Sequence, residues 1–428
     1  MSNLRVLIAG ASVAGPAAAY WFARAGAHVT VIERFPHLRR GGQNIDIRNV
    51  GVTVMRKTPG MEAAVRAKKA VEEGICIVDA EGRPFATMRA TGNPEQQSLV
   101  SEYEIMRGDL AHILYDMTKE NERVKYVFGE QIASTQQNES EDEPITVEFA
   151  NGLPTAEYDL VVACDGSTSR TRAIGLGCGV RDHITPTNCW AAFFSVQADL
   201  VNGSKMGHGF SATGGRLIAV GPDEVAGVNR ATFLKFYPRD GRDATLPFRE
   251  ASKQGTDALR RYVAQEFSGA GWKTDDIIKA MLETDDFYAS EAVQVKVPSL
   301  HKGRFVLVGD AGFAPGLTGT GTTLALVGAY LLAGEVGCRH KGDLAAGLAG
   351  YEERMRPILK DLQKPPGVLL SIIAPQTAWG IRLRNWLLVV IFWVMDSRIS
   401  GMFGWVGRLL GSAFSSDTYG LPDYEWVA

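Results

Sequence analysis

The first 33 residues constrain the fold more than any other part of the chain. Residues 4–9 form a short apolar run with the length of a buried strand, and a turn follows over residues 10–15. Residues 17–25 have the composition of a helix, with Pro16 at its expected first position. A second apolar run spans residues 28–32. This order predicts a βαβ unit and a parallel sheet covered by helices.

The turn of this unit has the spacing of a phosphate-binding loop. Gly10, Ser12 and Gly15 stand where a G-x-G-x-x-G sequence has its glycines, so that a pyrophosphate can approach the backbone amides at the helix N-terminus. Glu33 ends the second strand, where a carboxylate accepts hydrogen bonds from ribose hydroxyls. Ser12 departs from glycine, and its Cβ narrows the space for phosphate. A βαβ turn without nucleotide is the alternative, but it leaves Glu33 without a role, so we favour the dinucleotide site.

Two later strands end in comparable turns. Residues 158–164 are apolar and lead into Asp165-Gly166. Residues 304–308 lead into Gly309-Asp310 and then into a turn rich in glycine and threonine. Pro315 stiffens this last turn, and the amides near Gly321 belong to a predicted helix N-terminus, which stabilises negative charge.

The segments between these turns are rich in predicted strands. Residues 145–149 and 155–158 flank Asn151-Gly152 and predict a hairpin, whereas the polar residues 134–143 predict an exposed loop. Region 183–298 predicts a β-rich second domain inserted into the first. Its predicted strands are 190–198, 216–220 and 231–237, and its predicted helix is 257–267. Its candidate wall residues, to which we assign no role, are Phe193, Phe194, Phe210, Phe233 and Phe236.

Composition excludes several classes of function. The chain has 428 residues and a formal net charge of −3, which argues against a nucleic-acid binder. Its five cysteines are scattered, so we expect neither disulfides nor an oxidising compartment. We find no zinc-binding histidine pair, and no signal peptide at the start of the sequence, and we expect a cytoplasmic protein.

Three motifs in this order resemble the single-component (group A) FAD-dependent monooxygenases, the family of aromatic hydroxylases and tetracycline-inactivating enzymes. The motifs are GASVAG at 10–15, DLVVACDGSTSRTR at 159–172 and GRFVLVGDAGFAPGLTGTGTTLAL at 303–326. The resemblance, over residues 4–360, implies an α/β fold with a Rossmann-like, glutathione-reductase-like FAD-binding domain at 1–182 and 299–364. The inserted substrate domain would span 183–298, joined by part of 76–100, and a C-terminal helical segment would span 365–428.

The resemblance also implies roles for individual residues. Asp310 would accept hydrogen bonds from the ribityl chain, and Asp165-Gly166 would help to bind FAD and to place NAD(P)H. Arg107 would reach the flavin nucleotide, and Asp46 would lie close to the isoalloxazine, with Arg48 guiding substrate or cofactor. For Arg170 and Arg172 two roles stay open: a contact with a phosphate, or a place on a solvated helix face. The cofactor-binding set is Gly10, Ser12, Gly15, Glu33, Arg34, Asp46, Arg107, Asp165, Gly166, Asp310, Pro315, Gly321, Thr322 and Thr323; the family often has asparagine in place of Thr323.

The reaction that the resemblance implies is a hydroxylation. NADPH or NADH would reduce FAD, and the reduced flavin would form a C4a-hydroperoxide with O₂. One oxygen atom would then hydroxylate or epoxidise an aromatic, polycyclic or conjugated small molecule, in secondary metabolism or detoxification. No catalytic side chain and no metal ligand is predicted. A non-oxygenating flavin oxidoreductase and a flavin-holding binding protein stay open as alternatives, while the lack of a W-x-W-x-I-P stretch disfavours a halogenase.

The C-terminal segment carries the run WLLVVIFWVM at 386–395, with tryptophans at 379, 386 and 393. Ten apolar residues are too few for a bilayer-spanning helix, which needs about 20. We favour a helix that packs on the flavin domain and borders the substrate entrance. Membrane contact through 379–395, with peripheral association, and a dimer contact are the less favoured interpretations. The oligomeric state is left open.

Overall fold

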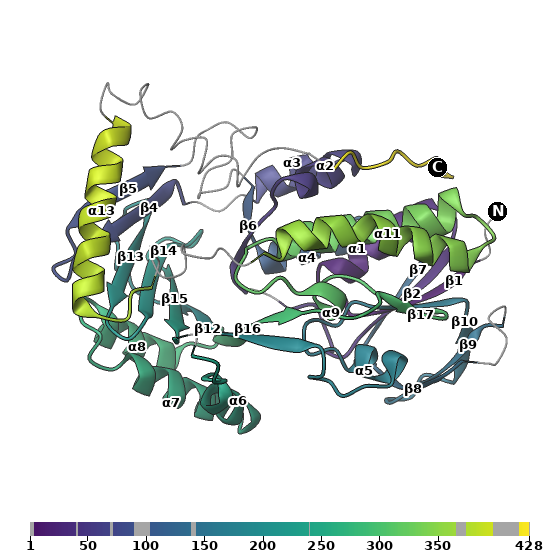
Figure 1. Ribbon diagram of the computed structural model, residues 1–428, viewed down its shortest axis with the longest axis horizontal. Coiled ribbons are helices and arrows are strands. Elements are labelled where there is room, and N and C mark those ends of the chain that lie inside the picture. The colour runs from purple at the N-terminus through teal and green to yellow at the C-terminus, as the bar shows by residue number, and fades with distance from the viewer. Residues whose placement is uncertain are drawn as a thin grey trace.

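The computed structural model describes residues 4–39, 42–68, 72–89, 103–137, 143–238, 240–364, 374–396 and 419–427, with side chains in the last helix as far as Val390. Two large β-sheets organise the chain (Figure 1). One sheet lies among the helices at the N- and C-terminal ends of the chain, and the other lies beside it with a layer of helices of its own. The result is an α/β first domain with a β-rich second domain, as the sequence predicts.

The first domain is built on a six-stranded sheet in the order β17-β18-β11-β1-β2-β7. All neighbours from β18 to β7 are parallel, and only β17 is antiparallel. Its inner strands are continuous apolar runs because helices or a further sheet cover both faces. The strands are β1 (Arg5–Ala9), β2 (His28–Glu33), β7 (Val124–Phe128), β11 (Leu160–Ala163), β17 (His301–Lys302) and β18 (Phe305–Leu307).

Helices α1, α4 and α11 lie on one side of this sheet (Figure 1), and α10 packs against α1 and α11. Helix α1 begins at Ala14, so Pro16 is its third residue, not its first as predicted. Among the described residues, one stretch, Gly321–Arg339, is long and apolar enough to cross a membrane, but 83% of it is buried inside the protein. It is a core helix. The helices of the domain are α1 (Ala14–Arg24), α2 (Val50–Lys57), α3 (Met61–Ala67), α4 (Arg107–Asp116), α5 (Arg170–Leu176), α9 (Asp310–Phe313), α10 (Gly321–Gly334) and α11 (Leu344–Leu362), with a π-helical turn at Glu335–Arg339.

Two small sheets complete the first domain. The predicted hairpin is confirmed as β9 (Ile145–Phe149) and β10 (Ala156–Tyr158), to which β8 (Ile132–Gln136) adds a third strand. The predicted loop at 134–143 is therefore wrong at its start, because residues 134–136 pair with β9; residues 138–142 lie outside the described residues. Strands β3 (Asn44–Asp46) and β6 (Glu104–Met106) form the other sheet.

The second domain is a seven-stranded sheet in the order β16-β12-β15-β14-β13-β4-β5. Strands β4 and β5 come from the region around 76–100 and extend the sheet at its far edge. Helices α6, α7 and α8 cover one face (Figure 1). The elements are β4 (Gly74–Val78), β5 (Pro84–Arg89), β12 (Ile184–Val196), β13 (Met206–Ala212), β14 (Arg216–Pro222), β15 (Asn229–Phe236), β16 (Tyr288–Val295), α6 (Leu246–Lys253), α7 (Thr256–Phe267) and α8 (Thr274–Glu283).

The two faces of this sheet have different compositions. Phe194, Phe210 and Phe233 pack in the core beneath α6–α8 and therefore do not line the opposite face. Phe236 belongs to a separate small cluster on the opposite face, and Phe193 alternates with Phe194 along β12. We name that opposite surface, which α6–α8 do not cover, the helix-free face. Of the five predicted wall candidates, only Phe193 and Phe236 point to it.

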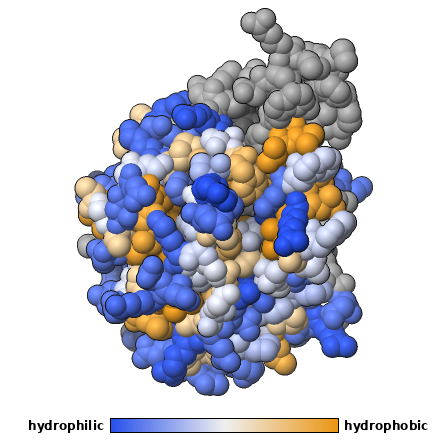
Figure 2. Space-filling view, turned by 90° about the vertical axis from the view of Figure 1, so that its left-hand side faces the viewer, coloured by the Kyte–Doolittle hydropathy of each residue, from blue (hydrophilic) through white to orange (hydrophobic). Residues whose placement is uncertain are grey.

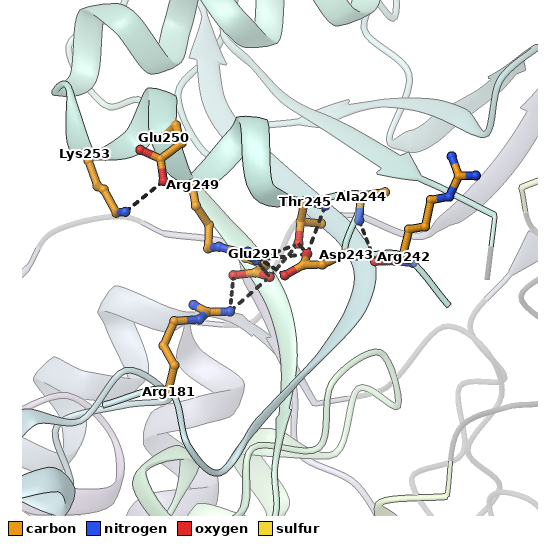
Figure 3. A network of polar contacts seen from close by, with 10 residues as sticks. Arg181, Arg242, Asp243, Ala244, Thr245, Arg249, Glu250, Lys253 and Glu291 are labelled. Carbon is orange, nitrogen blue, oxygen red and sulfur yellow. Dashed lines mark hydrogen bonds and ion pairs between the residues drawn. The ribbon is translucent and has the colours of Figure 1, made fainter. Parts of the chain in front are cut away.

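A polar network joins the two domains next to the predicted boundary at residue 182 (Figure 3). Glu291 of β16, whose side chain is 9% exposed, accepts hydrogen bonds from Thr245 Oγ1 at 2.6 Å and Arg249 Nη1 at 2.8 Å. Arg181, from the segment after α5, donates to the same carboxylate at 3.2 Å. Buried ion pairs of this kind are sensitive to the loss of one partner. The network fixes β16 relative to the first domain.

The end of the chain touches both domains. Helix α13 (Ala378–Asp396) has its main contacts with β5 and β13, beside the second sheet (Figure 1). It therefore packs mainly on the second domain, not on the flavin domain as we expected. Residues 419–427 return to the first domain, where Trp426 contacts Trp21 and the Tyr424 hydroxyl donates to Glu335 Oε1 at 2.6 Å.

Candidate functional site

The carboxyl ends of four neighbouring parallel strands, β2, β1, β11 and β18, meet at one edge of the first sheet. The three predicted turns leave the sheet at this edge and touch each other. A Cβ built on Gly10 would lie 2.6 Å from the carbonyl oxygen of Cys164, and one on Gly309 would lie 2.9 Å from Cβ of Ala14. Ligands of open α/β sheets bind at such carboxyl edges. The structure thus brings the three sequence motifs to one place.

The first turn is shaped by close backbone approach. Gly10 has a φ of 109°, and a Cβ on Gly15 would lie 1.8 Å from the carbonyl oxygen of Gly10. Glu33 stands at the end of β2, as predicted, and accepts hydrogen bonds from the backbone N–H groups of Ala11 at 2.9 Å and Phe35 at 3.1 Å. Its carboxylate therefore fixes the turn beside the predicted phosphate site.

Two neighbours of this turn complete the predicted set on its side of the sheet. The side chain of Ser12 is half-buried at the middle position of the turn. Arg34 follows Glu33 and places its guanidinium 4.8 Å from the ring centroid of Phe35, a cation–π contact at the same edge.

The second turn is organised by Asp165. Its carboxylate accepts hydrogen bonds from Ser169 Oγ and from the backbone N–H of Thr171 at 3.1 Å, so it ties the turn to the start of α5. Burial raises the pKa of Asp165, although these hydrogen bonds lower it in part. Gly166 has a φ of 90° and open space where a Cβ would stand. The accessible backbone of this turn lies at Gly166.

Arg172 has a role that the sequence did not reveal. We expected either a phosphate contact or a solvated helix face, but the side chain is fully buried. It donates to the backbone carbonyl of Ala311 at 2.7 Å and to that of Val180 at 2.6 Å. Arg172 thus connects the second motif to the third. The exposed Arg170, at the start of α5, fits the solvated face.

The third turn presents the carboxylate of Asp310, which is exposed in the structure. The surrounding protein raises the pKa of Asp310, and the nearby Arg107 lowers it in part. Its Oδ1 would lie 3.6 Å from a Cβ on Gly321, and Pro315 would lie 3.7 Å from the same point. Asp310, Pro315 and Gly321 are therefore side by side, with Thr322 next in α10.

The hydroxyl of Thr323, a residue of the predicted cofactor-binding set, makes a structural contact. It is 1% exposed, its Oγ1 accepts from the backbone N–H of Arg48 at 3.1 Å, and the hydroxyl donates to the carbonyl of Arg48 at 2.9 Å. Arg48 in turn pairs with Asp46, its Nη2 lying 2.9 Å from Asp46 Oδ2. Thr323 therefore fixes the segment after β3 against α10, and its hydroxyl is used in this contact.

These residues fit FAD as the sequence predicts. Glycine turns that a Cβ would fill stand at the N-terminus of α1, where a pyrophosphate is stabilised by the helix dipole and backbone amides. An accessible carboxylate, Asp310, lies beside the N-terminus of α10. The described residues contain no group of three or more His, Cys, Asp or Glu side chains able to hold a metal ion.

The helix-free face of the second sheet adjoins this site. Leu317, from the third turn, packs against a cluster that contains Cys189 and Phe236 of that face. Gln294 of β16 donates to the carbonyl of Pro315 at 3.1 Å. A surface of the second domain thus contacts the loop that is predicted to hold the flavin.

Sequence reasoning missed Glu72, which lies just before β4. Its carboxylate occupies the space beside Gly207 and Gly221, whose added Cβ atoms would come within 2.2 and 2.9 Å of it. Burial and, to a smaller extent, the charge of Glu104 of β6 together raise the pKa of Glu72 to about 8. No local motif signals this residue, because the glycines that accommodate it are more than a hundred positions away.

Comparisons with known proteins agree with this geometry. The family model of the FAD binding domain matches residues 3–364. The FAD-dependent monooxygenase asL4 of Sarocladium schorii is 35% identical, over 91% of this chain and 93% of its own. The monooxygenase CTB7 of Cercospora beticola is 32% identical, over 99% and 98%. The crystal structure of the tetracycline destructase Tet(51) superposes with a TM-score of 0.75 at 26% identity, covering 99% of this chain and all of that one.

The matches to the family model and to curated monooxygenases each extend over most of the chain. They agree with the order of the three motifs and with the convergence of the three turns. The chain therefore belongs to the FAD-binding-domain family and is an FAD-dependent monooxygenase of the aromatic hydroxylase type.

Proposed function

We propose that this enzyme consumes NADPH or NADH and inserts one atom of O₂ into an aromatic, polycyclic or conjugated small molecule, by hydroxylation or epoxidation. Secondary metabolism or detoxification is the proposed setting. Relatives named as FAD-dependent monooxygenases support the insertion of oxygen, and the structure named as a tetracycline destructase supports a polycyclic substrate. FAD supplies the reduction and oxygen chemistry when it is bound.

The observation that carries the proposal is the contact between the third turn and the helix-free face. Leu317 and the carbonyl of Pro315 meet this face, so a ring held at the turn would lie next to the second sheet. Strands β13 and β14 present small residues on this face, namely Gly207, Gly209, Ala219 and Gly221, and the carboxylate of Glu72 occupies the space beside Gly207 and Gly221.

The chain's own residues would hold the reactants and keep water away. Asp310 is proposed to accept hydrogen bonds from the ribityl chain, and Glu33 to do so from the adenosine ribose. Arg48 is held on both sides, by Thr323 at its backbone and Asp46 at its guanidinium, so it is preorganised at the substrate end of the site. The apolar cluster at Leu317 and Phe236 would exclude water.

Mass spectrometry under ¹⁸O₂ tests the reaction. Small aromatic and polycyclic compounds are first screened for those that accelerate NAD(P)H consumption by the FAD-loaded enzyme. We expect one ¹⁸O atom in the product of each accelerating compound. A product that carries no label, formed with the same NAD(P)H consumption, would identify a non-oxygenating flavin oxidoreductase. FAD binding without NAD(P)H consumption across the screen would favour a flavin-holding binding protein.

A further inference from the structure

Helix α13 has the opposite polarity from a helix that docks on a soluble protein. Such a helix buries its apolar side and exposes its charged side. Among the described side chains of α13, as far as Val390, the one turned inward most fully is Arg384, which is 7% exposed, and Ile381, Asn385 and Leu388 on the same side are half-buried. Most of the described apolar residues point outward: Trp379 is 70% exposed and Trp386 is 62% exposed.

The outward residues form one continuous stripe. Trp379, Leu383, Trp386, Leu387 and Val390 follow the spacing of one helix face, and all are exposed. Figure 2 views the molecule from the side on which α13 lies in Figure 1, and orange apolar patches interrupt the hydrophilic surface there. A clustered apolar stripe marks an interaction site, whereas single exposed apolar residues are ordinary.

We propose that the outer face of α13 docks on the surface of a lipid bilayer that contains anionic lipids. Tryptophan is enriched where a helix lies at the level of the lipid headgroups, because its ring is apolar and its N–H is polar. Exposed Arg382 lies among the stripe residues, positioned to meet an anionic headgroup. Four of the chain's eight tryptophans fall between residues 379 and 405.

Charge distinguishes a bilayer from a second copy of the chain. Of the basic residues from Leu362 to Met395, Lys364 pairs with Asp361 and Arg384 faces the protein, so Arg382 is the exposed cation beside the described part of the stripe. A two-fold dimer that places the stripe against itself would bring Arg382 toward the same residue of the second copy. An anionic bilayer instead complements the charge of Arg382.

The contacts of α13 favour a position on the bilayer and not across it. The helix packs along β5 and β13, and the buried Arg384 belongs to the side that faces the protein. A spanning helix would have to leave these contacts and take Arg384 into the hydrocarbon region. An interfacial helix keeps them and buries only its outer stripe.

Vesicle co-sedimentation of the full-length, FAD-loaded protein tests the proposal. We expect the protein to sediment with vesicles of phosphatidylcholine mixed with phosphatidylserine, and less with phosphatidylcholine alone. The double variant Trp379→Ser, Trp386→Ser should lose at least about tenfold in the bound-to-free ratio. Its flavin content and melting temperature should match those of the parent, because both side chains are exposed. A matched control, Leu246→Ser with Leu282→Ser, changes two exposed leucines elsewhere (50% and 45% exposed) and should bind as the parent does.

Size-exclusion chromatography with light scattering, performed without lipid, tests the competing interpretation that the stripe is a dimer contact. If the parent fails to bind either vesicle and forms a dimer that the tryptophan variant abolishes, the stripe is a contact between copies and the proposal is wrong. Equal sedimentation of the parent and the tryptophan variant would also overturn it. Neither result bears on the monooxygenase reaction, which is measured separately.

Discussion

The carboxyl edge of the first sheet and the helix-free face of the second sheet are the two sides of one site, and they are built differently. At the first, a Cβ added to Gly15, Gly10 or Gly309 would come within 1.8 to 2.9 Å of a neighbouring atom, so glycine is required, and the buried side chain of Arg172 connects one turn to the next. At the second, small residues come from strands far apart in the sequence, with Glu72 placed between them. The difference teaches that backbone geometry determines the shape of the cofactor end of the site. The shape of the substrate end depends instead on which side chains the strands of the second sheet carry.

The strongest test of this contrast is Gly15→Ala. A Cβ there would collide with the carbonyl of Gly10, so the first turn must move. We expect at least about a 100-fold loss of FAD affinity and destabilisation by about 3 kcal/mol. Flavin absorbance and chemical denaturation measure the two effects. Gly209→Ala, on the helix-free face, is the matched control, because its Cβ would meet nothing closer than 3.4 Å. If both variants keep their flavin equally, the contrast fails.

Arg172→Met tests the connection between the second and third turns. The variant leaves the carbonyls of Ala311 and Val180 without this donor, so we expect about 3 kcal/mol of destabilisation, with weaker FAD binding as a consequence. Urea denaturation of the apoprotein isolates the stability effect from that of the cofactor. The control Arg170→Met alters an exposed neighbour and should change stability by less than about 0.5 kcal/mol. Equal stability of the two variants would reject the connecting role.

Asp310→Ala separates ligand binding from folding. Because Asp310 is exposed in the structure, the removal of its carboxylate should change stability little. Charge-assisted hydrogen bonds to the ribityl chain would be lost, so FAD should dissociate about 30-fold more readily, or about 2 kcal/mol. Equilibrium dialysis with FAD gives the affinity. A flavin content equal to that of the parent would reject the assignment.

Glu72→Gln gives the smallest effect and probes the other side of the site. The pKa of Glu72 is raised from 4.5 to about 8, so the folded state holds its proton more tightly than the unfolded state does. The free energy of unfolding should therefore fall as pH rises from about 5 to about 8, by about 1.5 kcal/mol after allowance for partial solvent contact.

Denaturation at pH 6 and pH 9 measures this slope. Glu72→Gln should remove it, whereas Glu73→Gln, an exposed neighbour paired with Lys205, should retain it. Parallel slopes in all three proteins would show that Glu72 does not occupy a buried site.

Local sequence patterns predicted the first domain and most of its turns. The glycine spacing at 10–15 and the acid that ends β2 depend on a few adjacent residues, so they could be identified without an alignment. Contacts between residues far apart in the sequence could not be predicted in this way. Arg172 looked like a surface residue because its acceptor, Ala311, is 139 positions away. Thr323 looked available because Arg48, which uses its hydroxyl, is 275 positions away.

The second domain follows the same rule. Its strands were recognisable from apolar alternation, but which face met the flavin domain was not, because alternate residues on one strand serve both faces. Phe193 and Phe194 are neighbours with opposite surroundings. Helix α13 was recognisable as apolar, but its inverted orientation on β5 and β13 depends on contacts that no local pattern specifies.

A crystal structure of the protein with FAD would test the central claim most directly. The account predicts one extended FAD, with its ribose at Glu33, its pyrophosphate at the N-terminus of α1 and its ribityl chain at Asp310. The ring would lie between the loop at Pro315–Gly321 and the helix-free face. A cofactor bound elsewhere, or side chains such as Leu317 and Phe236 filling the place of the ring, would contradict it.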